Sequence, residues 1–192
     1  AQFSLGEAIT PTLPAPTPTV GLPAAPVISS PTHPDSDQWY ANNSPKFVWK
    51  IPEGVTAVRL LVGRQATAQP NVLYEPAISQ RELENLDDGV WYFSAQFKNN
   101  AGWGAIARFQ FQIDTEPPTK FEMTQLERKD LTEPRVSFRF EAEDAMSGIS
   151  HYTILLNGQE IEQWRDSEKT GKYITPILEP GYYEFVARAT DF

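Results

Sequence analysis

One sequence pattern occurs twice in this chain of 192 residues. The first copy, at residues 86–99, reads LDDGVWYFSAQFKN, and the second, at residues 178–191, reads LEPGYYEFVARATD. Leucine, glycine, an aromatic residue, phenylalanine and alanine fall in the same register in both copies. An offset of about 90 residues is the length of one β-sandwich domain. The repeat therefore predicts two domains of one kind in tandem.

Alternating apolar and polar residues predict that both domains are all-β. From Trp91 to Phe97 every second residue is apolar, which is the period of a half-buried strand. Similar alternation marks five further segments, namely 46–50, 58–62, 109–113, 136–142 and 152–156. No segment shows sustained helical periodicity. The aromatic residues that we expect to be buried are Phe47, Trp49, Trp91, Phe93, Phe138, Phe140, Tyr183 and Phe185.

Proline-rich stretches divide the chain into three parts. Residues 10–26 carry repeated prolines, which cannot join a sheet interior and favour an extended polyproline conformation. They act either as a semi-stiff spacer or as a disordered tail. The run DTEPP at residues 114–118 breaks the sheet again. We expect an N-terminal segment at 1–26, a first module at 27–115 and a second module at 116–192.

The second module ends before a strand that the first module contains. Roughly 14 residues complete the turn and closing strand of the first module, and no counterpart follows Phe192. Three explanations stay open. The protein continues beyond this sequence, or the module closes with a different strand order, or a strand from another copy fills the gap. Residues 1–9, with Phe3 and Leu5 on one side, are the candidate donor for the last explanation.

Composition and charge exclude several classes of function. The formal net charge is −9 without a basic face, which argues against nucleic-acid and anionic-membrane partners. No apolar stretch approaches the length of a membrane span, and no signal peptide is expected within the sequence. The absence of cysteine excludes thiol chemistry and zinc–thiolate sites. No serine lies in a nucleophile elbow, and we expect no enzymatic activity.

Several motifs resemble the fibronectin-III-like and Ig-like modules of long bacterial surface proteins. In the first module these are SPTHP at 30–34, Trp39-Tyr40, Phe47-Val-Trp49, LDDGVWYF at 86–93, NAGW at 100–103 and IDTEPP at 113–118. In the second they are DAMSGI at 144–149 and Ala189-Thr-Asp191. Such repeats usually continue from Ala-x-Asp into Ala-Gly-Asn and a last strand, which are missing here.

The resemblance implies two tandem Ig/fibronectin-III-like β-sandwiches preceded by a Pro-rich extended segment. It further implies a non-catalytic stalk, spacer or filament segment at the bacterial cell surface, outside the cell. Its partners would be other modules of the same protein or copies of itself. The alternative is an adhesin or carbohydrate-binding module that contacts a glycan or a host or cell-surface protein. The architecture itself does not select between these roles, because it hosts many of them.

Two sets of residues are candidate sites. Loop aromatics could stack on carbohydrate or anchor a partner, although loop tryptophans also plug the open ends of sandwiches. These are Trp39, Tyr40, Trp103 and Trp164. Acidic residues in the linker and loops could hold calcium, which takes oxygen ligands, or could instead cap turns. These are Asp114, Glu116, Asp144 and Asp191. No other cofactor is expected.

Overall fold

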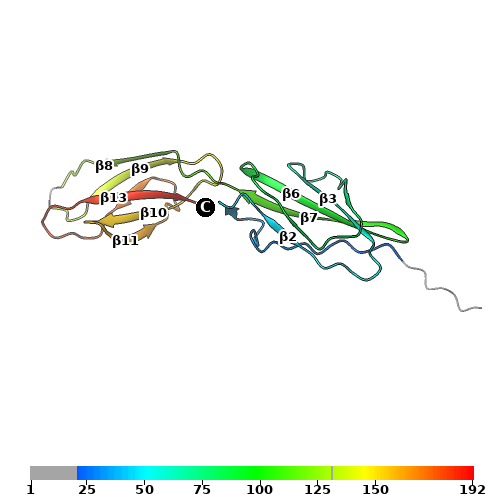
Figure 1. Ribbon diagram of the computed structural model, residues 1–192. Coiled ribbons are helices and arrows are strands. Elements are labelled where there is room, and N and C mark those ends of the chain that lie inside the picture. Colours follow the sequence, from blue (N-terminus) through cyan, green and yellow to red (C-terminus); the bar gives the residue numbers. More distant parts are fainter. Residues whose placement is uncertain (1–20, 131) are drawn as a thin grey trace, which may run out of the picture.

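The computed structural model describes residues 21–130 and 132–192, and the described chain forms two elongated β-sandwiches arranged end to end (Figure 1). Part of the Pro-rich spacer and the candidate donor at residues 1–9 lie outside the described residues. In the first module the strands are β1 Trp39–Tyr40, β2 Lys46–Val48, β3 Ala57–Gly63, β4 Val72–Tyr74, β5 Gln80–Glu82, β6 Gly89–Asn99 and β7 Gly102–Ile113. In the second they are β8 Lys120–Gln125, β9 Ser137–Glu143, β10 Ile149–Leu156, β11 Gln159–Trp164, β12 Lys172–Ile174 and β13 Phe185–Asp191.

The same strand order occurs in the main sheet of both modules. The first module has a five-stranded sheet in the order β1-β7-β6-β3-β4 against the pair β2-β5. The second has β11-β10-β13 against β12-β9-β8. Thus β13 corresponds to β6, β10 to β3 and β11 to β4. The fold is an all-β, fibronectin-III-like sandwich in both cases, as the repeat predicted, and the second module does not adopt a different strand order.

Each module has its own hydrophobic core. In the first, Phe47 stacks on Phe93 with ring centroids 4.3 Å apart, and both are fully buried. In the second, Phe138 stacks on Phe185 at 4.2 Å, and Phe140 stacks on Tyr173 at 5.7 Å. The expected burial of five of the eight aromatic residues is confirmed, namely Phe47, Trp49, Phe93, Phe138 and Phe140.

The remaining three aromatic residues lie nearer the surface than expected. Trp91 and Phe185 are half-buried, and Tyr183 is 39% exposed. Trp91 and Tyr183 make equivalent hydrogen bonds, each to a backbone carbonyl four residues upstream. Trp91 Nε1 donates to the carbonyl of Asp87 at 2.8 Å, and the Tyr183 hydroxyl donates to the carbonyl of Glu179 at 2.9 Å. Each side chain folds back over the chain four residues upstream and fixes the corner that enters β6 or β13.

His33 is fully buried in the first module, within a bend of the chain. Its Nε2 lies 2.9 Å from the Asn42 carbonyl oxygen and its Nδ1 lies 3.0 Å from Thr32 Oγ1. Its ring contacts Tyr40 and Phe111, with centroids 4.6 and 5.7 Å away. Burial lowers the pKa of His33 below its ordinary value of 6.5, while the Asn42 carbonyl raises it in part.

This burial predicts that the first module loses stability in mild acid. As the pH falls below 6.5 the unfolded chain takes up the His33 proton before the folded chain does. The contribution of neutral His33 to the free energy of unfolding is therefore fully present above pH 6.5, and it is lost as the pH falls toward the lower pKa of His33 in the folded state. Melting curves measured as a function of pH, for the wild type and His33→Gln, test this. Equal pH slopes in the two proteins would contradict it.

Candidate functional site

The junction between the modules is built on Asp114, the residue that follows β7. The parallel pairing of β1 with β7 places Tyr40 beside Ile113, and the Asp114 N–H donates to the Tyr40 carbonyl at 3.1 Å. The Asp114 side chain is only 5% exposed. Its Oδ2 accepts a hydrogen bond from the Ser147 N–H of the second module at 2.9 Å, and its Oδ1 accepts from the Glu116 N–H at 3.3 Å. One buried carboxylate thus bridges the two modules.

A tight loop of the second module faces Asp114. This loop joins β9 to β10, and Gly148 within it has a φ of 78°. Asp144 Oδ1 accepts from the Met146 N–H at 3.0 Å and from the Gly148 N–H at 2.7 Å. The turn-capping role considered for Asp144 is therefore present. These bonds also fix the direction of the carboxylate.

Asp191 completes the cluster from the end of β13. Its partner in the sheet is Ile149, so strand pairing brings it to the same end of the module as the β9–β10 loop. One carboxylate oxygen from each of Asp114, Asp144 and Asp191 lies within 4.8 Å of the others. Three of the four predicted acidic residues are therefore brought together. Glu116 is exposed, and its carboxylate is not part of the group.

The three carboxylates repel one another without a cationic partner. Among the described residues, no lysine or arginine forms a salt bridge with any of them. Burial raises the pKa of Asp191, and the charges of Asp114 and Asp144 raise it further. Like charges held this close destabilise a fold unless a cation neutralises them.

The spacing of the carboxylate oxygens is compatible with calcium, and a buried hydroxyl lies beside them. Calcium binds oxygen at about 2.3–2.6 Å, so two ligands on opposite sides of the ion lie up to about 5 Å apart, and the three oxygens here lie within 4.8 Å of one another. The Ser147 Oγ is buried and has no hydrogen-bond partner within the described chain. It belongs to the residue whose N–H binds Asp114, and Ser147 lines the same cavity as Asp191.

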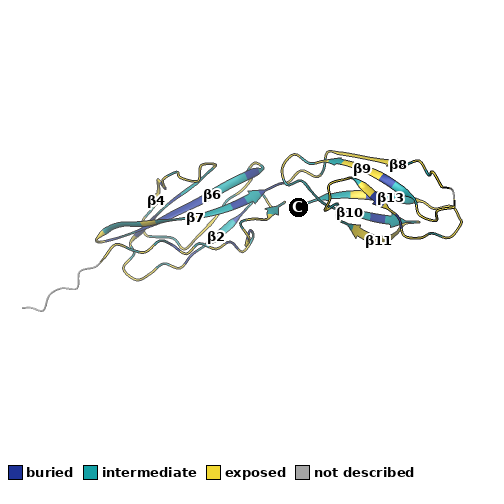
Figure 2. Ribbon diagram, turned by 180° about the vertical axis from the view of Figure 1, so that it is seen from behind, coloured by how far each residue is buried: buried dark blue, intermediate teal, exposed yellow. Residues whose placement is uncertain are grey.

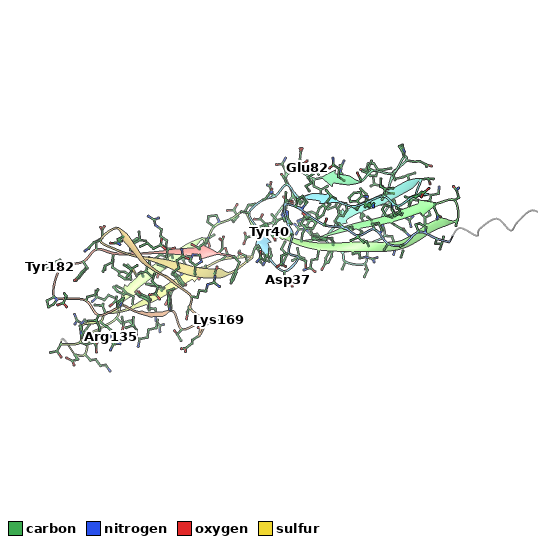
Figure 3. All side chains as sticks on the ribbon, turned by 90° about the horizontal axis from the view of Figure 1, so that it is seen from below. Asp37, Tyr40, Glu82, Arg135, Lys169 and Tyr182 are labelled. Carbon is green, nitrogen blue, oxygen red and sulfur yellow. The ribbon has the colours of Figure 1, made fainter. Side chains whose placement is uncertain are left out.

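That cavity, of about 440 Å³, lies between the modules. Asp37, Gln38 and Trp39 line it from the first module, opposite Asp191 and Phe192 of the second. Asp37 and Tyr40 both lie at the end of the first module that faces the second (Figure 3). Of the three carboxylate residues, Asp191 lines this cavity. A larger hollow of about 890 Å³ lies on the second module between β9 and the loop at residues 165–171.

The four candidate aromatic residues do not form one surface. Trp39 lines the junction cavity, and the adjacent Tyr40 packs on His33. Trp103 lies at the β6–β7 hairpin, where the Arg59 guanidinium covers its ring at 4.5 Å. Trp164 packs in the second core, with ring centroids 5.4–5.7 Å from Tyr173, Tyr152 and Phe140.

Comparison with known proteins finds similar solved structures but no matching family model. No family model matches the chain, and no curated protein matches it. Among solved structures, the fibronectin(III)-like modules of Clostridium thermocellum CbhA align over 86% of both chains, with 13% identity and a TM-score of 0.46. The FN1–FN3 domains of chicken CNTN1 align over 88% of this chain and 62% of theirs, with 12% identity and a TM-score of 0.44. Within the described residues, no helix is long and apolar enough to cross a membrane.

Proposed function

We propose that this chain is a non-catalytic, extracellular spacer whose two modules are held in line by calcium at their junction. The observation that carries the proposal is the convergence of Asp114, Asp144 and Asp191 from three separate segments of the chain. Asp114 belongs to the first module and the other two to the second. An ion bound by all three therefore joins the modules and restricts their angle.

An extracellular location is consistent with the affinity expected of this calcium site. Calcium sites in extracellular modules have dissociation constants of about 10⁻⁴–10⁻³ M, which suits a group in which Asp144 and Asp191 are partly open to solvent. The sequence motifs that resemble bacterial surface repeats support a place in a bacterial surface protein. A carbohydrate-binding role has less support, because the candidate aromatic residues lie at separate places and Arg59 covers Trp103.

The first expected result is a calcium-dependent rise in melting temperature. A ligand present at about 100 times its dissociation constant stabilises the folded state by about 2.7 kcal/mol. Asp144→Asn and Asp191→Asn are expected to lose this response. Glu116→Gln removes a charge from the same junction outside the carboxylate group, and it is expected to keep the response. Thermal unfolding with calcium and with a chelator measures all four proteins.

The apo proteins provide a second comparison. Without calcium, Asp191→Asn removes like-charge repulsion, so it is expected to be at least as stable as the wild type. A purely structural role for Asp191 predicts the opposite, a loss of stability in both conditions. A calcium response of equal size in the wild type and Asp191→Asn would exclude the proposed site.

Small-angle scattering tests the spacer role separately from the metal. The expected result is a narrow distribution of inter-module angles with calcium and a broader one with a chelator. A broad distribution in both conditions would contradict the stiff-spacer function. A narrow distribution of angles that does not respond to calcium would support the spacer function and contradict the calcium site.

A further inference from the structure

The outer face of the five-stranded sheet carries positive charge in an acidic chain. Val58, Leu60 and Phe93 point into the core of the first module, so the residues that alternate with them along the strands point outward. None of the five strands contains aspartate or glutamate, although the whole chain has 25 acidic residues. We call the following outward residues of β3, β6 and β7 the basic face: Arg59, Leu61, Tyr92, Lys98, Trp103, Ile106 and Arg108. The three cations among them come from separate strands, so the sequence did not reveal a basic face.

The centre of the basic face is an arginine whose position is fixed by its neighbours. Arg59 Nε donates to Gln96 Oε1 at 2.7 Å, and Gln96, which is only 7% exposed, also donates to the Gly104 carbonyl. The Arg59 guanidinium lies over the Trp103 ring at 4.5 Å, and Lys98 Nζ lies 5.8 Å from the same ring. Among the described residues, no carboxylate forms a salt bridge with a cation of this face. The guanidinium is thus held in place with its Nη1 and Nη2 donors available to an acidic group.

The second module presents a flat face of opposite charge, the acidic face, formed by Glu122, Glu141 and Glu143. On β9, Phe140 is buried in the core, whereas Glu141 and Glu143 are exposed, as the alternating colours of its ribbon show (Figure 2). Glu141 lies directly opposite Glu122 of β8 in the sheet, and like charges in that position destabilise a sheet. Lys120 contacts Glu122 and Glu143 at 3.7 and 3.6 Å. Glu141 has no ion pair within the described parts of the chain.

We propose that the basic face of one copy of this chain docks on the acidic face of a second copy. The two modules of one copy lie end to end, so its own two faces lie at separate places along the molecule and cannot meet (Figure 1). Residues 116–192 carry 15 acidic and 9 basic residues, a net charge of −6, whereas the strands of the basic face carry three cations and no acid. The inference adds association between copies to the proposed spacer and does not depend on the calcium site.

The size of the basic face sets the expected strength of the contact. At about 3.4 Å per residue, the 11 residues of β6 extend about 37 Å, and three strands about 4.8 Å apart cover about 14 Å. The face therefore covers about 500 Å², below the roughly 800 Å² that each partner of a standard stable complex buries. Tryptophan, tyrosine and arginine, which often dominate such contacts, are all present on it. We expect a reversible association with a micromolar or weaker dissociation constant.

Sedimentation velocity of the full chain over a range of concentrations tests the association. At about 0.1 M salt the screening length is about 10 Å, so facing charges attract while the repulsion between distant charges is largely screened. The wild type is expected to form oligomers there and to sediment as a monomer at about 1 M salt. Arg59→Glu is expected to weaken the association at least tenfold. Arg81→Glu makes the same change of charge at an exposed position on β5, in the other sheet of the same module, and is expected to associate like the wild type.

Reversal of charge on both faces locates the contact. A chain with Arg59→Glu and Arg108→Glu has two acidic faces, and a chain with Glu141→Lys and Glu143→Lys has two basic ones. Each chain alone is expected to remain monomeric, because like charges then face one another. Their equimolar mixture is expected to associate, because each chain supplies the charge that the other lacks. Melting curves establish that both chains are folded, and a misfolded chain would not regain association on mixing.

The same measurements can overturn the proposal. A wild type that stays monomeric at every concentration in about 0.1 M salt would do so. Association that persists in either charge-reversed chain would also contradict it, because the contact would then lie elsewhere on the surface. A mixture of the two chains that remains monomeric would exclude the pairing of these two faces. The calcium response of the melting temperature still tests the spacer function in each case.

Discussion

Phe93→Ala is expected to lower the stability of the first module by about 3–5 kcal/mol, the usual cost of removing a buried phenylalanine side chain. Phe93 is fully buried, stacks on Phe47 at 4.3 Å and contacts Trp49 at 5.6 Å. For a domain of this size, each kcal/mol shifts the melting temperature by about 4–8 °C. The first unfolding transition is therefore expected to fall by at least about 12 °C.

Leu73→Ala is the matched control for this prediction. Leu73 lies on β4 of the same module and is 54% exposed, so its truncation is expected to change stability by less than about 0.5 kcal/mol. The second module has a separate core, and its transition is expected to stay in place in both variants. Equal melting temperatures for Phe93→Ala and the wild type would contradict the core assignment.

The long strands were predictable because their apolar residues alternate with polar ones, although burial follows this alternation in β9 and not in β6, where Ser94 and Gln96 are buried as well. Apolar residues at every second position of segments 91–97, 136–142 and 152–156 correspond to β6, β9 and β10. The Asn157-Gly158 turn was predictable for a backbone reason. Both residues have positive φ, 51° and 79°, as the two-residue turn between β10 and β11 requires.

The short edge strands were not predictable by the same reasoning. All three residues of β5 are polar, so no apolar alternation marks it as a strand, and β8 carries only two apolar residues, Phe121 and Met123, at alternate positions. Their extended conformation depends on pairing with β2 and β9, which lie far away in the sequence. The strand conformation of such short segments is determined by tertiary contacts, and their local sequence pattern does not determine it.

The candidate site was predictable in its residues and only in part in its geometry. Loop carboxylates near the linker suggested calcium, and Asp114, Asp144 and Asp191 do converge. Their convergence depends on the pairing of Ile149 with Asp191, which the sequence does not reveal. Glu116 was included because it is close to Asp114 in sequence, but the chain turns there and only its backbone N–H contacts Asp114.

Gly171→Ala is expected to destabilise the second module by about 2–5 kcal/mol, because two costs add. Gly171 has a φ of +66°, a conformation that costs an L-residue about 1–2 kcal/mol. An added Cβ would also lie 2.5 Å from the Phe140 carbonyl oxygen, so the backbone has to move, at about 1–3 kcal/mol. That movement strains the 2.8 Å hydrogen bond from the Phe140 N–H to the Gly171 carbonyl, beside the pairing of β12 with β9.

Gly158→Ala separates these two costs. Gly158 lies in the same module with a φ of +79°, and a Cβ there would meet nothing within 4 Å. Only the conformational cost of about 1–2 kcal/mol is expected. Chemical denaturation of the two variants, followed by tryptophan fluorescence, gives the difference directly. Equal losses of unfolding free energy in the two variants would show that the backbone around Phe140 moves to accommodate the added Cβ without an energetic cost. A larger loss at Gly171 would show that close backbone contact between the β11–β12 loop and β9 contributes to the stability of this module.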